Sequence, residues 1–298
     1  MPANSKKNHQ NIISIMILIF DSGSTKTTVA KVSDSDTLAE FIPLSRGINA
    51  MTVKNGELKG LISECDALLS DAEHVDEVYY YGAGCATDEA CERIRTDLTL
   101  LFHNSRIEVS SDMLGAARAA CGNSAGIVGI LGTGSNSCLY DGRNIVENVS
   151  PLGYILGDEG SGAVLGRLFL GRLLKGQFCY DVLNDFKNDC SFSIPEIITR
   201  VYRESRPNAF LASFAPFILK CCRYQDVNSF VIDEFRRYIR NNLLNYTGFG
   251  VLPVNFIGSI AENFHSQLSE AMQAEKGVMG RVIQSPISAL AHFHSHAL

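Results

Sequence analysis

Two glycine-rich turns that carry hydroxyl side chains each follow a run of apolar residues, and this composition suits phosphate binding. The first is Asp21-Ser-Gly-Ser-Thr-Lys and the second is Gly132-Thr-Gly-Ser-Asn-Ser, which aligns Gly23 with Gly134. Glycine lets the backbone approach a phosphate closely, and consecutive N–H groups and hydroxyls satisfy its oxygens. We expect two duplicated α/β units that hold a polyphosphate between equivalent turns. An ordinary hairpin turn, or a chance match of two Gly-Ser pairs, is the alternative.

Neither turn belongs to the two commonest nucleotide motifs. The chain contains no Gly-Lys-Ser or Gly-Lys-Thr, which excludes a Walker A loop. No complete Gly-x-Gly-x-x-Gly follows an expected strand, which argues against dinucleotide binding.

Three polar residues outside the turns are candidates for chemistry. Asp112 follows a strand-like run and precedes Met-Leu-Gly-Ala-Ala, so it can act as a base or cap a helix. Asp158 can bind a ligand or cap an expected helix over residues 161–174. Asn49 lies in an expected loop, where asparagine also favours turns without any ligand.

Length and composition restrict the classes of protein to which the chain can belong. The 298 residues suggest two domains, and 46% hydrophobic residues suffice for two cores. A net charge of −6 without a long basic run argues against nucleic acid and anionic membranes as partners. The nine cysteines follow no disulfide or zinc pattern, so we expect mostly buried, reduced thiols and a cytoplasmic location. The apolar residues 12–20 are too short to span a bilayer and are expected to form the first strand, after a dispensable leader at residues 1–11.

The hydrophobic pattern predicts two α/β units that share no glycine- or proline-rich linker. Expected strands are residues 12–20, 27–33, 38–44, 77–81, 106–110, 127–131, 137–140, 254–257 and 278–283. Expected helices are residues 57–69, 88–102, 161–174, most of 193–247 (with Pro195 and Pro207 at helix starts), one after Gly258, and one from Pro286. The predicted domains are residues 12–114 and 115–298, with the last helix returning to the first domain.

Five short motifs in order resemble one family. The two turns resemble the first and second phosphate motifs of the superfamily that includes actin, hexokinase and the heat-shock ATPases. Phe256-Ile-Gly-Ser-Ile-Ala resembles its adenosine motif. Ser110-Ser-Asp-Met-Leu-Gly and Gly153-Tyr-Ile-Leu-Gly-Asp-Glu-Gly resemble segments of the BadF/BadG/BcrA/BcrD-type ATPases and N-acetylglucosamine kinases. The resemblance covers residue 16 to the C-terminus and implies two ribonuclease-H-like (actin-like ATPase) domains around a nucleotide cleft.

The resemblance also implies a role for each motif residue in an ATP-dependent sugar kinase that uses Mg²⁺. Asp21 would anchor Mg²⁺, and Asp112 would be the base acting on a sugar hydroxyl. The implied nucleotide-binding residues are Ser22, Gly23, Ser24, Thr25, Lys26, Gly132, Thr133, Gly134, Ser135, Gly258 and Ser259. Asn49, Asn136 and Asp158 would bind the sugar, for which N-acetylglucosamine, phosphorylated at its 6-hydroxyl, is the first candidate.

Two other functions and several sugars stay open at this point. A BadF-type ATPase that activates a dehydratase would need cysteines for a shared iron–sulfur cluster, and only Cys138 follows a phosphate turn. A non-catalytic sugar or nucleotide sensor would need neither Asp21 nor Asp112. The Asn-Ala-Met-Thr sequence at Asn49 departs from the family, so glucosamine, glucose or a muramyl sugar are alternatives. Family members are often dimers, so the resemblance also suggests a homodimer.

Overall fold

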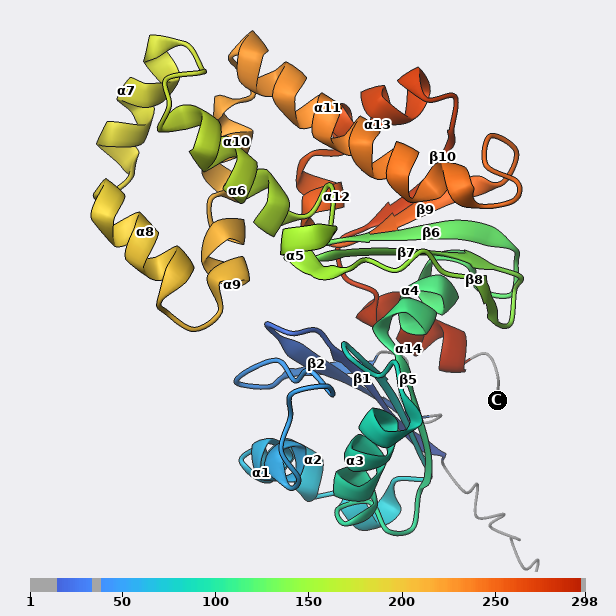
Figure 1. Cartoon of the computed structure of the whole chain (residues 1–298). Helices are drawn as coiled ribbons and strands as arrows, with labels where there is room; N and C mark the ends of the chain where they lie inside the picture. The colour runs from blue at the N-terminus through green and yellow to red at the C-terminus, as the bar shows by residue number, and fades with distance from the viewer. Residues whose placement is uncertain (1–14, 34–38, 296–298) are drawn as a thin grey trace, which may run out of the picture.

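Runs of Ile, Leu, Phe and Val form the central strand of each of two sheets. In the computed structural model, which describes residues 15–33 and 39–295, each sheet has five strands and forms the middle of one lobe (Figure 1). Ile17 and Phe20 in the first lobe, and Ile127 and Val128 in the second, are at most 1% exposed. These strands are buried on both faces, which explains their continuous apolar sequence.

The strands of the two sheets correspond one to one. The first sheet contains β1 (Met16–Ser22), β2 (Thr27–Ser33), β3 (Glu40–Pro43), β4 (Glu77–Gly82) and β5 (Arg106–Ser111). The second contains β6 (Gly126–Leu131), β7 (Ser135–Tyr140), β8 (Ile145–Glu147), β9 (Pro253–Ile257) and β10 (Val278–Ile283). The orders are β3-β2-β1-β4-β5 and β8-β7-β6-β9-β10, each with an antiparallel hairpin followed by two parallel strands. The predicted duplication of the α/β unit is therefore confirmed.

The register of the two hairpins corrects the alignment of their turns. Ser22 pairs with Thr27 at the end of the first ladder, and Leu131 pairs with Ser135 at the end of the second. The second turn is one residue shorter, so Ser135 corresponds to Thr27 and not to Ser24. The alignment of Gly23 with Gly134 also pairs Ser24 with Ser135, and it does not reveal this difference in turn length.

Helices cover both faces of the first sheet. One face packs on α1 (Glu57–Ser63), α2 (Asp66–Leu69), the short 3₁₀ turn η1 (Ala72–His74) and α3 (Asp88–Thr99). Asp97 on α3 is 4% exposed, and its carboxylate accepts N–H groups of Gly56, Leu58 and Lys59 at the start of α1. The expected single helix over residues 57–69 is therefore two helices, and the first is capped by a residue distant in sequence.

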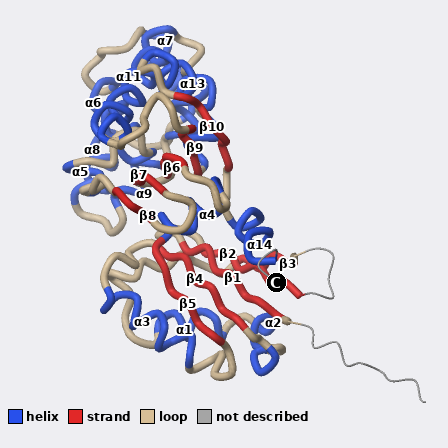
Figure 2. Tube along the Cα trace, turned by 90° about the vertical axis from the view of Figure 1, so that its right-hand side faces the viewer, coloured by secondary structure: helices blue, strands red, loops and turns tan. Residues whose placement is uncertain are grey.

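Two helices lie between the lobes, each following one sheet and packing on the other (Figures 1 and 2). They are α4 (Asp112–Cys121), which follows β5, and α14 (Ile287–Ser295), which follows β10. α4 contacts β6, β7, β9 and β10 as well as β4 and β5, whereas α14 packs on β1 and β2. The division predicted between residues 114 and 115 falls inside α4 and stays a prediction.

The remaining helices belong to the second lobe. They are α5 (Gly153–Leu156), α6 (Gly162–Leu173), α7 (Tyr180–Asp189), α8 (Ile194–Tyr202), α9 (Pro207–Ala212), α10 (Ala215–Cys221), α11 (Gln225–Asn241), η2 (Leu243–Asn245), α12 (Ser259–Asn263) and α13 (His265–Ala274). Figure 1 shows α6 to α10 as an arm beside the sheet that extends over the first lobe. None of the described helices combines the length and the apolar character that a membrane crossing requires.

The expected elements differ from the structure mainly in the second lobe. The helical stretch from residue 193 is broken into several helices, and Pro195 and Pro207 stand in the first turns of α8 and α9 as predicted. β8, α5 and α7 were not predicted. The expected leader, residues 1–11, and the start of the expected first strand lie outside the described residues.

All nine cysteines are free in the structure. The expectation that most of them are buried was wrong. Cys85, Cys138 and Cys221 are buried, five are partly exposed, and Cys179 is exposed.

Candidate active site between the two lobes

The first turn, residues 23–26, joins β1 and β2 at the side of the sheet that faces the cleft. Its backbone closes through the Gly23 N–H, which donates to the Lys26 carbonyl at 2.9 Å. Ser24, Thr25 and Lys26 are exposed. The Ser22 hydroxyl is buried, 2.8 Å from the Thr27 hydroxyl, and thus supports the turn from inside the sheet. Three of the five residues predicted for this phosphate motif therefore present side chains to solvent.

Two further glycines hold the loops around the first turn, and the sequence patterns did not single them out. A Cβ on Gly47 would lie 2.1 Å from the Gly23 carbonyl oxygen, and the Gly47 N–H donates to the Thr25 carbonyl at 3.1 Å. A Cβ on Gly84, which has a φ of +78°, would lie 2.2 Å from Asn49 Oδ1. The loop after β3, the turn after β4 and the first turn are thus packed backbone against backbone. Gly47 belongs to the Arg46-Gly-Ile-Asn segment, and the position of this segment next to Asn49 is the sequence feature that could have identified it.

Two carboxylates lie at the carboxyl ends of β1 and β5, the strands on either side of β4. Burial raises the pKa of Asp21 to about 6, Lys26 lowers it in part, and the charge of Asp112 raises it further. Burial also raises the pKa of Asp112, against hydrogen bonds from backbone N–H groups at the start of α4. The Tyr80 hydroxyl beneath them is buried and has no hydrogen-bond partner among the described residues. A pair of buried acids with shifted pKa values in a cleft is typical of a functional site.

The alternative roles of Asp112 and Asp158 as helix caps are wrong. The N-cap of α4 is Ser111, whose side chain accepts the Leu114 N–H, and Asp112 is the first helical residue. The N-cap of α6 is Ser161, whose side chain accepts the Val164 N–H. Neither carboxylate is therefore the N-cap of its helix, although Asp112 accepts N–H groups in the first turn of α4.

The second turn lies against Asp158. Burial raises the pKa of Asp158 to about 6, although its carboxylate accepts the N–H groups of Ser135 and Gly153. A Cβ on Gly134 would lie 2.9 Å from Asp158 Oδ2. Asp158 also has a positive φ of 51°, which is uncommon for a residue other than glycine. Asp158 therefore lies against the second turn, and the Ser135 N–H donates to its carboxylate.

The two predicted sugar-binding asparagines lie on opposite lobes. Asn49 Nδ2 donates to the Ser24 hydroxyl at 3.3 Å, and its Oδ1 accepts the Met51 N–H at 3.0 Å. Asn136 on β7 accepts the Ser137 N–H with its Oδ1. Asn49 therefore contacts the first turn directly, and Asn136 lies just beyond the second.

The predicted adenosine motif adjoins the second turn. A Cβ on Gly258, which has a φ of +120°, would lie 2.3 Å from the Leu131 carbonyl oxygen. Gly132, Thr133 and Ser259 line a common cavity of about 610 Å³. The rest of its wall consists of Ala212, Ser213, Ala215, Pro216, Leu219, Ile260, Asn263 and Phe264. Of these, Ile260 belongs to the predicted adenosine motif, whereas the residues of α9 and α10 carried no motif, because only the folded arm brings them to the turn.

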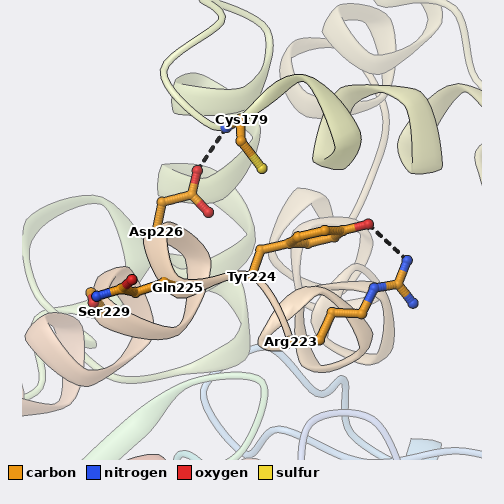
Figure 3. A pocket seen from close by; sticks show the side chains of 6 residues that line it. All are labelled: Cys179, Arg223, Tyr224, Gln225, Asp226 and Ser229. Carbon is orange, nitrogen blue, oxygen red and sulfur yellow. Dashed lines mark hydrogen bonds between the residues drawn. The ribbon is translucent and has the colours of Figure 1, made fainter.

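A second hollow lies at the start of α11 and contains none of the predicted site residues (Figure 3). Its polar groups already bind one another. The Asp226 carboxylate accepts the Cys179 N–H at 2.6 Å, and the Arg223 guanidinium donates to the Tyr224 hydroxyl at 2.9 Å. We therefore place the chemistry in the cleft and not in this open hollow.

The donor set of the cleft fits Mg²⁺ only together with a nucleotide. No three His, Cys, Asp or Glu side chains of the described residues are arranged to hold a metal. Mg²⁺ is commonly held by one or two carboxylates, substrate phosphates and water. Asp21, with Asp112 nearby, supplies that number of carboxylates next to a phosphate-type turn.

Comparison with known proteins agrees with this architecture of paired sheets and facing turns. The sequence profile of the BadF/BadG/BcrA/BcrD ATPase family matches residues 20–291. This chain therefore belongs to the BadF/BadG/BcrA/BcrD ATPase family. None of the curated proteins matches it.

Solved structures support the same assignment. A protein from Porphyromonas gingivalis, provisionally designated an N-acetylglucosamine kinase, is 44% identical with a TM-score of 0.88, over 94% of this chain and 99% of that one. A Chromobacterium violaceum protein with the same provisional designation is 16% identical with a TM-score of 0.67, over 94% and 98% of the two chains. A glucokinase from Streptomyces griseus, in complex with glucose and AMPPNP, is 14% identical with a TM-score of 0.53, over 94% and 98%. The last two show the shared fold.

Proposed function

We propose that the protein is an ATP-dependent sugar kinase that phosphorylates the 6-hydroxyl of N-acetylglucosamine. One observation carries the proposal. Asp112 is a partly buried carboxylate that follows β5, lies near Asp21 beside the first turn, and is not the N-cap of its helix. The designation of the 44% identical Porphyromonas protein supports N-acetylglucosamine as the acceptor.

The nucleotide would bind along the second lobe with its phosphates in the cleft. The cavity beside Ser259 is of the size that small ligands occupy, and it opens onto the second turn. Gly132 and Thr133 lie at the junction of the cavity and the cleft. The base and ribose would fill the cavity, while residues 23–26 and 132–134 would contact the phosphates.

Transfer needs positioning and one proton acceptor. The sugar hydroxyl oxygen forms a bond to the terminal phosphorus of ATP, the bond from that phosphorus to the ADP oxygen breaks, and the hydroxyl proton passes to Asp112. Burial raises the pKa of Asp112, which makes its ionised form a stronger base than that of an exposed aspartate. Mg²⁺ held near Asp21 would neutralise charge on the phosphates.

The sugar would lie between the lobes, in contact with Asn49, Asn136 and Asp158. Asn49 and Asp158 adjoin the first and the second turn, respectively, so a sugar between them is next to the terminal phosphate. Asn49→Ala is expected to weaken sugar binding by about 1–3 kcal/mol. ATP binding should change less than sugar binding.

An ADP-release assay with a panel of N-acetylglucosamine, glucosamine, glucose and a muramyl sugar tests the proposal. We expect the highest kcat/KM on N-acetylglucosamine, with sugar 6-phosphate as the product. Nucleotide binding without turnover on any of these sugars would contradict it and favour a sensor. The dehydratase activator is disfavoured, since Cys138, the cysteine that follows the second turn, is fully buried on β7.

A further inference from the structure

One side chain of the helical arm crosses the cleft to the first turn. Arg206 lies in the connection between α8 and α9, and its Nη2 donates to the Ser24 carbonyl at 3.0 Å. Figure 1 shows the arm extending over the first lobe on this side. The sequence patterns did not single out this residue.

The backbone of Arg206 is in a conformation that the residue does not favour. Its φ of 62° and ψ of 48° are left-handed, and it immediately precedes Pro207. Glycine adopts this region without steric conflict, whereas a residue with a Cβ is strained there, and a following proline restricts it further. Strain of this kind persists where function needs a side chain in a particular place. Here it aims a guanidinium at the other lobe.

Most N–H donors of the Arg206 guanidinium, and its positive charge, have no partner among the described residues. It forms no ion pair with a carboxylate of the described residues, and the Ser24 carbonyl takes one of its five N–H groups. The acids Asp21 and Asp112 lie by the same turn, so a nucleoside triphosphate there adds negative charge to a region that already carries it. Lys26 is the cation that this turn itself contributes. A guanidinium pairs with phosphate through two parallel N–H donors, which a lysine cannot do.

We propose that Arg206 is a phosphate-binding residue supplied across the cleft. It holds the first turn through the Ser24 carbonyl and donates its remaining N–H groups to the terminal phosphate of the bound nucleoside triphosphate. The inference rests on the proposed function, because it takes the cleft to be the nucleotide site. Through Arg206, the helical arm distinguishes a nucleoside triphosphate from a diphosphate.

Titration calorimetry with ATP and with ADP, each with Mg²⁺, tests this role in the full chain. Arg206→Ala should weaken ATP binding roughly 10- to 100-fold, the usual effect of removing a charged hydrogen bond, and should change ADP binding less than about threefold. Arg206→Lys should fall between, because it keeps the charge and loses the paired donors. Arg203→Ala is the matched control, since Arg203 is exposed, lies three residues earlier, and its guanidinium has no hydrogen-bond or ion-pair partner among the described residues.

A second variant separates phosphate binding from folding. Arg206→Gly removes the guanidinium and also relieves the left-handed backbone, so its melting temperature without nucleotide should equal or exceed that of the parent. It should still lose ATP affinity as Arg206→Ala does. Equal losses for ATP and ADP, or no loss, would overturn the inference and leave Arg206 as a tie between the lobes. A parent that binds ATP but phosphorylates no sugar would overturn the proposed function alone, and one that binds neither nucleotide would overturn both.

Discussion

At the scale of single residues, the candidate site contains acids that the folded protein partly withdraws from water. Burial raises the pKa values of Asp21, Asp112 and Asp158, and no basic side chain forms an ion pair with any of them among the described residues. Such groups destabilise the protein on their own, so they are expected where a ligand uses them.

Replacing Asp112 with Asn tests its role as the base. Loss of a general base typically lowers the rate about 10²- to 10⁴-fold, so kcat on the best sugar should fall by that factor. The N-cap, Ser111, is untouched, and the substitution is nearly isosteric, so the melting temperature should change little.

Asp88→Asn is the matched control for this variant. Asp88 is likewise the first residue of its helix, after the N-cap Thr87, but it is exposed and belongs to none of the predicted motifs. It should leave kcat unchanged. A stable Asp112→Asn enzyme with the parental kcat would remove Asp112 from the mechanism.

The sequence could identify the acids but not their supports. Asp21, Asp112 and Asp158 stand in short motifs beside glycine, and a motif is local information. Gly47, Gly84 and Arg206 matter because loops distant in sequence meet in the fold. The spacing of residues along the chain does not indicate which distant loops will contact one another.

At the scale of elements, strands were more predictable than helices. β2 and β10 have the expected bounds, and both contain β-branched residues, which favour strands. The helices of the arm were merged in the prediction, because their apolar faces continue across short turns such as the one at Arg206. α7, whose helix ends have no side-chain cap, gave no boundary signal.

The close packing of the loops on the first turn leads to a second prediction. Gly47→Ala would push a methyl group into the Gly23 carbonyl and displace the turn, since overpacking of this kind typically costs about 1–3 kcal/mol. The rise in melting temperature on adding ATP with Mg²⁺ should shrink accordingly.

Gly60→Ala provides the comparison. Gly60 is exposed within α1, and a Cβ there meets nothing within 4 Å. Alanine should stabilise the helix by about 1 kcal/mol and leave the response to ATP intact. A Gly47→Ala protein that responds to ATP like the parent would show that the turn is not part of the nucleotide site.

At the scale of the whole molecule, the lobes are joined by buried polar contacts between α4, α14 and β4. The Arg118 Nη1 donates to the Tyr81 hydroxyl at 2.6 Å, which leaves the hydrogen of that hydroxyl for His294 Nε2 at 2.8 Å. His294 is 4% exposed and stacks on Tyr79 with ring centroids 3.7 Å apart. This histidine is therefore held neutral at the joint between the lobes.

The buried histidine predicts a pH dependence of stability. Burial, assisted by Arg118 and opposed in part by Glu108, lowers the pKa of His294 to about 4. Between pH 6.5 and 4 the unfolded chain binds a proton at this position and the folded protein does not. Lowering the pH through this window therefore removes stability, up to roughly 3 kcal/mol, and above pH 6.5 the full stability is present.

Urea unfolding of the parent and of His294→Asn between pH 7.5 and 4.5 isolates this effect. Asp21 and Asp158 act in the opposite direction, since their raised pKa values near 6 make the folded state bind protons first. The difference between the parent and the variant cancels their contribution and should shrink as the pH falls. Replacing the exposed His265 with Asn should leave the parental curve unchanged, and a difference that is constant with pH would contradict the assignment.

The exchange of helices between the sheets governs the order in which the chain can become compact during synthesis. The face of the first sheet that carries Ile17 and Ile19 is covered by Ile287 and Leu290 of α14, so its covering helix is made only after the entire second lobe. Contacts this distant in sequence form late, because closing the intervening chain is entropically costly. Before then, only α4 among the described helices covers part of this apolar face in a nascent first lobe. We expect it to be a client of chaperones until α14 emerges, and the two lobes to complete their folding together.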